Sequence, residues 1–136
     1  MRSETAERVL KWLFIALGGL AATAVVPMTM PFAWMQAVND AIGLEPLVDT
    51  PLAQYLTRSL SAVYALFGVM TIYIGLDVRS YRRLIVLIGW LTGLLGLALT
   101  VIDFAVGMPA SWSWGEGPPT VVVAWAIVWL ARRVRH

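Results

Sequence analysis

Residues 84–106 read LIVLIGWLTGLLGLALTVIDFAV and contain one charged side chain, Asp103. A helix needs about 20 mostly apolar residues to cross a bilayer, because each residue adds ~1.5 Å and the hydrocarbon core is ~30 Å thick. This stretch meets both the length and the composition that crossing requires. It predicts a transmembrane helix.

Three further apolar blocks accompany this stretch, at about residues 12–30, 56–76 and 118–131. The 136-residue chain is 60% hydrophobic and 13% charged, with a mean hydropathy of +0.77, which is too apolar for a soluble domain of this length. We therefore expect an all-α membrane protein, a single antiparallel bundle of four transmembrane helices over residues 1–136. The fourth block is short unless residues 112–119 extend its outer end.

The basic residues predict the orientation. Nine of the ten form three clusters that border apolar blocks: Arg2, Arg8 and Lys11; Arg79, Arg82 and Arg83; Arg132, Arg133 and Arg135. The positive-inside rule places all three in the cytoplasm, so both termini are expected there, and the loops 31–55 and 107–118, which lack Lys and Arg, face outward. Such clusters are typical of topology signals and not of nucleic-acid binding. Arginine far outnumbers lysine, which favours a GC-rich bacterium and hence a bacterial inner membrane.

The first block has an alternative interpretation as a cleaved signal peptide, because residues 22–24 read Ala-Thr-Ala, a small-residue cleavage pattern. Glu4 and Glu7 interrupt the basic start, and the apolar run continues beyond the pattern. We expect a retained helix.

The first outer loop predicts a short interfacial helix within residues 31–43. The spacing separates an apolar face from a polar one: Met35, Val38 and Ile42 against Gln36, Asn39 and Asp40. Gly43 is placed to end this helix. Thr50 and Pro51 are an N-cap and a first-turn proline for the next span.

Each predicted span carries a stripe of small residues, through which helices approach closely in lipid. The four stripes are Gly18, Ala21, Ala22 and Thr29; Arg58, Ser61, Ala62, Ala65 and Gly68; Gly89, Gly93, Gly96, Thr100 and Asp103; Thr120, Ala124 and Ala131. They suit one compact bundle, a homo-oligomer or a larger membrane complex, and the sequence does not decide between these.

Arg58 and Asp103 are the two ionisable residues within spans. Counted from Ser80 in the cytoplasmic turn, they lie 22 and 23 residues away, which predicts nearly equal depth in the outer leaflet. A charge at membrane depth needs a partner. The favoured interpretation is a structural ion pair. The alternative is an outward-facing pocket in which Arg58 holds an anionic or carbonyl-bearing ligand and Asp103 or Glu116 exchanges a proton.

Four further residues complete the candidate ligand site. Glu116 precedes the predicted fourth helix, where a carboxylate favours the positive end of the helix dipole, so a capping role is expected. Trp112 and Trp114 are typical of the membrane interface. Tyr64, in the second span, needs a hydroxyl partner if it faces inward.

The second and third spans resemble the DoxX-like group of small bacterial four-helix membrane proteins. The resemblance covers about residues 58–109 and rests on Arg58, Tyr64, Gly68, the Arg-rich turn, Asp103, Gly107 and Pro109. It implies a four-helix bundle and, as in some relatives, an association with membrane redox or quinone-linked machinery.

Three functions compete. The first is a non-catalytic accessory or assembly subunit of a membrane complex; the second is a protein that binds or transports a small molecule, quinone or lipid. A membrane enzyme is the least favoured, because no nucleophile, metal-ligand spacing or cofactor motif accompanies the acids, and the chain has no cysteine. We expect no metal and no cofactor.

Overall fold

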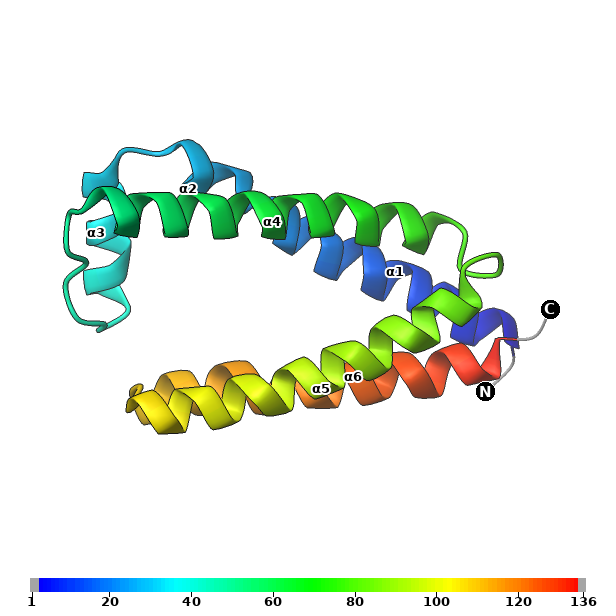
Figure 1. The fold of residues 1–136 in the computed structure, drawn as a ribbon. Helices are drawn as coiled ribbons and strands as arrows, with labels where there is room; N and C mark the ends of the chain where they lie inside the picture. Colours follow the sequence, from blue (N-terminus) through cyan, green and yellow to red (C-terminus); the bar gives the residue numbers. More distant parts are fainter. Residues whose placement is uncertain (1–2, 135–136) are drawn as a thin grey trace. The chain divides into compact units, whose positions relative to one another are not determined.

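The computed structural model describes residues 3–134, in which all regular structure is helical (Figure 1). The helices are α1 (Ser3–Ala22), α2 (Val25–Thr29), α3 (Phe32–Ala41), α4 (Pro51–Leu76), α5 (Arg82–Val106) and α6 (Ala110–Arg133). Three helical stretches within these residues are long and apolar enough to cross a membrane, namely Ser3–Thr29, Pro51–Leu76 and Arg82–Val106. The predicted all-α class is therefore confirmed, and the length and composition of three stretches support a membrane protein.

The described residues divide into two units, and each is described by itself. The first unit contains residues 3–13 and 74–134; the second contains residues 14–73. The first therefore holds the start of α1, the turn after α4, and the pair α5 and α6.

In the first unit, α5 and α6 lie side by side and antiparallel (Figure 1). The glycines of α5 make this possible: a Cβ on Gly89 would lie 2.6 Å from a methyl of Val128, and one on Gly96 would lie 3.0 Å from the carbonyl oxygen of Gly117. From the α6 side, a Cβ on Gly117 would collide with the Thr100 hydroxyl. The small-residue stripe of α5 therefore serves the contact with α6.

The turn between α4 and α5 is tied to the neighbouring helix ends. Arg79 Nε donates to Glu7 Oε2 at 2.7 Å, an ion pair with the start of α1. Arg82 Nε donates to the carbonyl oxygen of Ala131 at 2.9 Å, so it satisfies a carbonyl of the last turn of α6.

The amino-terminal third of α6 differs from the sequence prediction. The predicted outer loop is wrong for residues 110–118, which are helical, and the alternative that residues 112–119 extend the fourth block is confirmed, since α6 has 24 residues. Pro118 and Pro119 lie inside this helix. Each lacks a backbone N–H, which removes the donors that the carbonyls four residues earlier would otherwise use. The connection between α5 and α6 therefore consists of residues 107–109. Gly107 ends α5 and has a left-handed φ of 79°.

In the second unit, the end of α1 packs closely on α4. A Cβ on Gly18 would lie 2.6 Å from the carbonyl oxygen of Gly68, and a Cβ on Gly68 would collide with the backbone of Ala22. Two of the predicted small-residue stripes therefore meet at this crossing. Their function is close backbone approach, as expected for helices in lipid.

The helical stretch that contains α1 and α2 is interrupted at residues 23 and 24, which form a turn between the two helices. Pro27 explains the break, because in a continuous helix its ring would clash with the carbonyl of the residue four positions earlier, Thr23. The Thr23 hydroxyl donates to the carbonyl oxygen of Leu20 at 2.6 Å and stabilises the turn locally.

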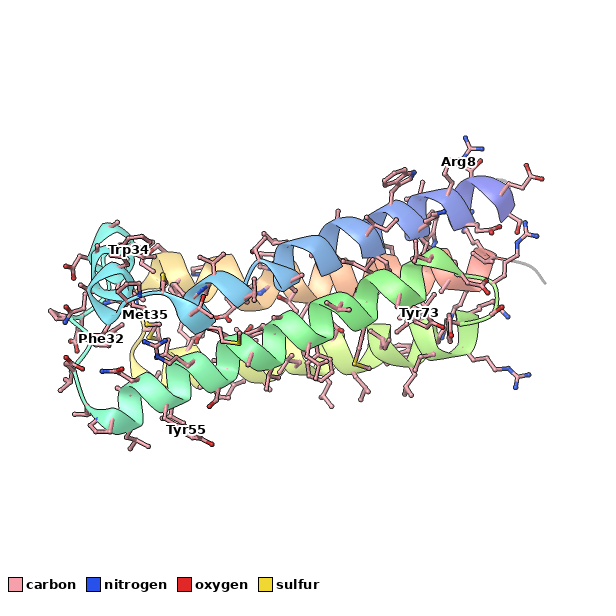
Figure 2. The ribbon with its side chains drawn as sticks, turned by 90° about the horizontal axis from the view of Figure 1, so that it is seen from above. Arg8, Phe32, Trp34, Met35, Tyr55 and Tyr73 are labelled. Carbon is pink, nitrogen blue, oxygen red and sulfur yellow. The ribbon has the colours of Figure 1, made fainter. Side chains whose placement is uncertain are left out.

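The predicted helix of the first outer loop is present as α3, preceded by Pro31 and followed by Gly43 with φ +75°. Its buried face differs from the expected one: Met35 and Asn39 are buried, whereas Val38 and Ile42 are exposed. Figure 2 shows Met35 beside the exposed Trp34 on α3. The reason lies in the loop that follows, because the Asn39 side chain donates to the carbonyl oxygen of Glu45.

The start of α4 follows the prediction. The Ala53 N–H donates to the Thr50 hydroxyl at 3.1 Å, and Pro51 is the first helical residue. Thr50 is therefore the N-cap.

Candidate functional site

Asp103 lies one turn before the end of α5, and its side chain is 5% exposed. Its backbone carbonyl accepts the N–H groups of Gly107 and Met108, which closes the helix end. Its carboxylate is not satisfied in this way: Oδ2 is buried and has no hydrogen-bond partner among residues 3–134. A buried carboxylate oxygen without a donor is costly, so this position requires a donor that α5 and α6 do not supply.

Two hydroxyl groups of the same helix pair, those of Ser113 and Thr100, bond to backbone carbonyls of their own helix turns. The antiparallel register places Ser113 of α6 at the level of Asp103, and Ser113 is fully buried. The Ser113 hydroxyl lies 3.4 Å from the carbonyl oxygen of Pro109, and the Thr100 hydroxyl donates to the carbonyl oxygen of Gly96 at 2.8 Å. Both bonds are local ones within a helix turn. They leave the Asp103 carboxylate as the one acid of this helix pair that faces no donor in the described chain.

Glu116 has a different environment from Asp103. It was predicted to cap the fourth helix, and this prediction is wrong, because α6 begins at Ala110 and Glu116 lies beyond the first turn. Its Oε2 accepts the indole N–H of Trp112 at 2.7 Å, one turn earlier on the same helix. Glu116 therefore fixes a tryptophan and does not cap a helix.

The two tryptophans of this region play separate roles. Trp112 is part-buried through its bond to Glu116, whereas Trp114 is 65% exposed. The Trp114 ring meets Phe104 of α5 edge to face, with centroids 6.2 Å apart and planes at 80°. This pair stabilises the end of the helix pair beside Asp103.

Arg58, in the second unit, uses its guanidinium to hold the end of α2. Its Nη1 donates to the carbonyl oxygen of Met28 at 3.0 Å and its Nη2 to that of Met30 at 3.2 Å. Carbonyls at a helix carboxyl end lack intrahelical donors, and a cation there also suits the helix dipole. Arg58 therefore has a structural role that the sequence did not reveal. The guanidinium carries five N–H donors, so these two bonds do not exhaust it.

Tyr64 lies on α4 and is 47% exposed. The described structure thus brings together Trp112 with Glu116, and places Asp103 on the same helix pair. Arg58 and Tyr64 belong to the other unit, so the proposed pairing of Arg58 with Asp103 stays a prediction from the sequence.

Sequence reasoning missed the arginines at the end of α6, which it treated only as topology signals. Arg132 lies over the ring of Trp90, with its Cζ 5.7 Å from the ring centroid, and Arg133 lies over Trp129 at 4.1 Å. A signal existed in the sequence, because Trp125, Trp129 and Arg133 follow one another at four-residue spacing and must share one face of a helix.

Comparisons with protein-family models, with curated proteins and with solved structures gave no match to this chain. The resemblance to DoxX-like proteins therefore stays a hypothesis from the sequence.

Proposed function

We propose that this protein is a non-catalytic accessory or assembly subunit of a membrane complex. The observation that supports this function is the buried Asp103 carboxylate, whose Oδ2 has no donor among residues 3–134. In lipid, a polar side chain of this kind associates helices, because a donor on a neighbouring helix removes the cost of burial. The donor to Asp103 Oδ2 then belongs to a helix of the partner protein. If the partner is a second copy of this chain, Arg58 of that copy is the candidate donor.

The small-residue stripes restrict how the partner binds. Gly89 and Gly96 of α5 are in close contact with α6, and Gly18 and Gly68 are in close contact with each other. Association with a partner must therefore use the exposed apolar faces, such as that of α4 with Leu56, Leu60 and Phe67.

The proposed setting is the bacterial inner membrane, with four spans and both termini in the cytoplasm. The basic clusters support four spans, since three spans would place the termini on opposite sides. At 24 residues α6 is long enough to serve as the fourth. We retain the DoxX-like relationship as part of this proposal.

The second candidate function is binding of a small molecule, quinone or lipid from the outer side. The same Asp103 oxygen supports it, because a hydroxyl or N–H of a ligand would satisfy Oδ2 as well as a protein donor would. Trp114 and the Trp112–Glu116 pair lie on the same helix pair and would line the approach.

Gentle purification from the native membrane, followed by native mass spectrometry, separates the two functions. We expect a stoichiometric protein partner that is lost from Asp103→Asn, while Glu116→Gln, which changes an acid already bonded to Trp112, retains it. A chain that carries no protein partner but a stoichiometric quinone or lipid, and loses that ligand in Asp103→Asn, would instead establish the second function. Helical content measured by circular dichroism must stay unchanged in both variants.

A further inference from the structure

A groove of about 630 Å³ lies on the surface between α5 and α6, and Asp103 is not among its lining residues. Small residues with little or no side chain, Gly89, Gly93 and Ala124, lie between larger exposed ones. The exposed borders are Trp90, Leu94 and Leu97 on α5 and Trp125 on α6. The glycines that allow the helices to approach therefore also leave a hollow. Its volume lies within the ~300–1,000 Å³ typical of ligand sites.

One end of this groove is basic. Arg132 and Arg133 line it, and both guanidinium groups lie over indole rings, those of Trp90 and Trp129. Trp125 stacks on Trp129 with planes at 19°, so the aromatic surface continues along the groove. The rest of the lining is apolar.

The guanidinium groups of Arg132 and Arg133 are suited to bind an anion. A guanidinium that lies over an aromatic ring uses its face, and its N–H edge is free to bind phosphate oxygens in a bidentate manner. Within residues 3–134 the structure records no hydrogen bond and no ion pair for Arg132 or Arg133. By contrast, Arg79 is bonded to Glu7 and Arg82 to the carbonyl of Ala131.

We propose that this groove binds an anionic phospholipid, with the headgroup phosphate at Arg132 and Arg133 and an acyl chain over Gly93 toward Leu97. The charge separation along the groove, cationic at one end and apolar beyond it, matches this class of lipid and not a free anion, which would leave the apolar part unused. Basic pockets between helices on the cytoplasmic side are suited to anionic lipid headgroups. This site is independent of Asp103 and of the proposed assembly function.

Native mass spectrometry in detergent with added lipid tests the site. The full chain is mixed with phosphatidylglycerol or with phosphatidylcholine of the same acyl chains, and the retained lipid is counted. We expect phosphatidylglycerol to be retained about tenfold more strongly, and this preference to disappear in Arg132→Gln/Arg133→Gln, because charge-assisted bonds to phosphate are lost. The matched control is Arg8→Gln/Lys11→Gln, which removes the same charge from α1, where Arg8 points away from the helix (Figure 2).

A second variant tests the acyl chain. A Cβ on Gly93 would lie 3.4 Å from the Ala124 methyl, an ordinary contact, and Gly93 lines the groove, so the larger side chain of Gly93→Leu is expected to fill it; circular dichroism must show unchanged helical content. It should lower retention of both lipids. Equal retention of the two lipids by the wild type, equal loss in the α1 control, or unchanged retention in Gly93→Leu would each overturn the proposal. Displacement of the lipid by millimolar glycerol phosphate would overturn it too, since the site would then bind a free anion.

Discussion

Two adjacent glycines of α1 have opposite environments. A Cβ on Gly18 would lie 2.6 Å from the carbonyl oxygen of Gly68 and 2.8 Å from the backbone nitrogen of Ile72, whereas a Cβ on Gly19 meets nothing within 4 Å. Backbone atoms cannot move aside as a side chain can. We therefore expect Gly18→Ala to lower the free energy of unfolding by about 1–3 kcal/mol.

The control for this prediction is Gly19→Ala, which should leave stability unchanged or raise it by up to ~1 kcal/mol through helix propensity. Thermal or denaturant unfolding in detergent, followed by circular dichroism, measures both. Equal effects of the two substitutions would show that α1 does not pack on α4 through Gly18.

Asp77 lies in the turn between α4 and α5, outside the spans. The hydroxyl of Ser80 and its backbone N–H, which donates to Oδ1 at 3.2 Å, lower the pKa of the Asp77 carboxyl, and the charge of Arg79 lowers it further. A lowered folded-state pKa stabilises the turn at neutral pH, and this contribution is lost as pH falls through that pKa. We expect Ser80→Ala to raise the pKa of Asp77 toward its ordinary value, measured by carboxyl NMR titration. An unchanged titration in Ser80→Ala would contradict the contribution of the Ser80 hydroxyl, because the variant keeps the backbone N–H.

At the scale of elements, Arg58 holds the end of α2 through the carbonyls of Met28 and Met30. Arg58→Gln should therefore destabilise the protein by about 1–3 kcal/mol, because two part-buried carbonyls lose a charged donor. The predicted pairing with Asp103 adds a second expectation: in a double-mutant cycle with Asp103→Asn, the two effects should couple by at least about 0.5 kcal/mol.

Strict additivity of the two substitutions would limit Arg58 to capping α2. Asp103 would then require a partner outside the chain, which strengthens the assembly function. The cycle thus distinguishes a donor within the chain from a donor on a partner.

Two amide side chains of α3 bond to the loop that follows it, and one of them, Asn39, is buried. Asn39 is buried and donates to the carbonyl oxygen of Glu45, while Gln36 donates to that of Leu47 at 3.3 Å. We expect Asn39→Ala to accelerate hydrogen exchange in residues 40–48, because the buried amide anchors this loop to α3. Asp40→Ala, at an exposed neighbouring position, should leave exchange unchanged. Equal exchange in both variants would show that the loop is held by other contacts.

For the whole molecule, the number of spans decides the side on which the carboxyl end lies. Among residues 3–134, three helical stretches qualify as spans by length and composition, and α6 is the element whose crossing is to be tested. With four spans, a carboxy-terminal alkaline phosphatase fusion should be inactive and a carboxy-terminal green fluorescent protein fusion fluorescent. The reverse pattern, together with an amino-terminal tag protected in spheroplasts, would establish three spans.

Much of the architecture follows from local sequence. Apolar length predicts the membrane helices, since the thickness of the bilayer sets the number of residues. Short-range chemistry likewise predicts α3, its ending at Gly43 and the N-cap Thr50, because each depends on neighbours within a few residues. The stripe containing Gly89 and Gly96 was also visible in the sequence as a packing face.

Tertiary structure decided what the stripe packs against and where the polar side chains find partners. Residues 110–119 contain two glycines and two prolines, which locally favour turns, yet they are helical because Gly117 packs against Thr100 and Gly96. Arg58 reaches carbonyls 28 and 30 residues away, and Arg82 one 49 residues away. No local pattern encodes such distances, because a hydrogen bond forms between groups that folding brings together and not between groups close in sequence.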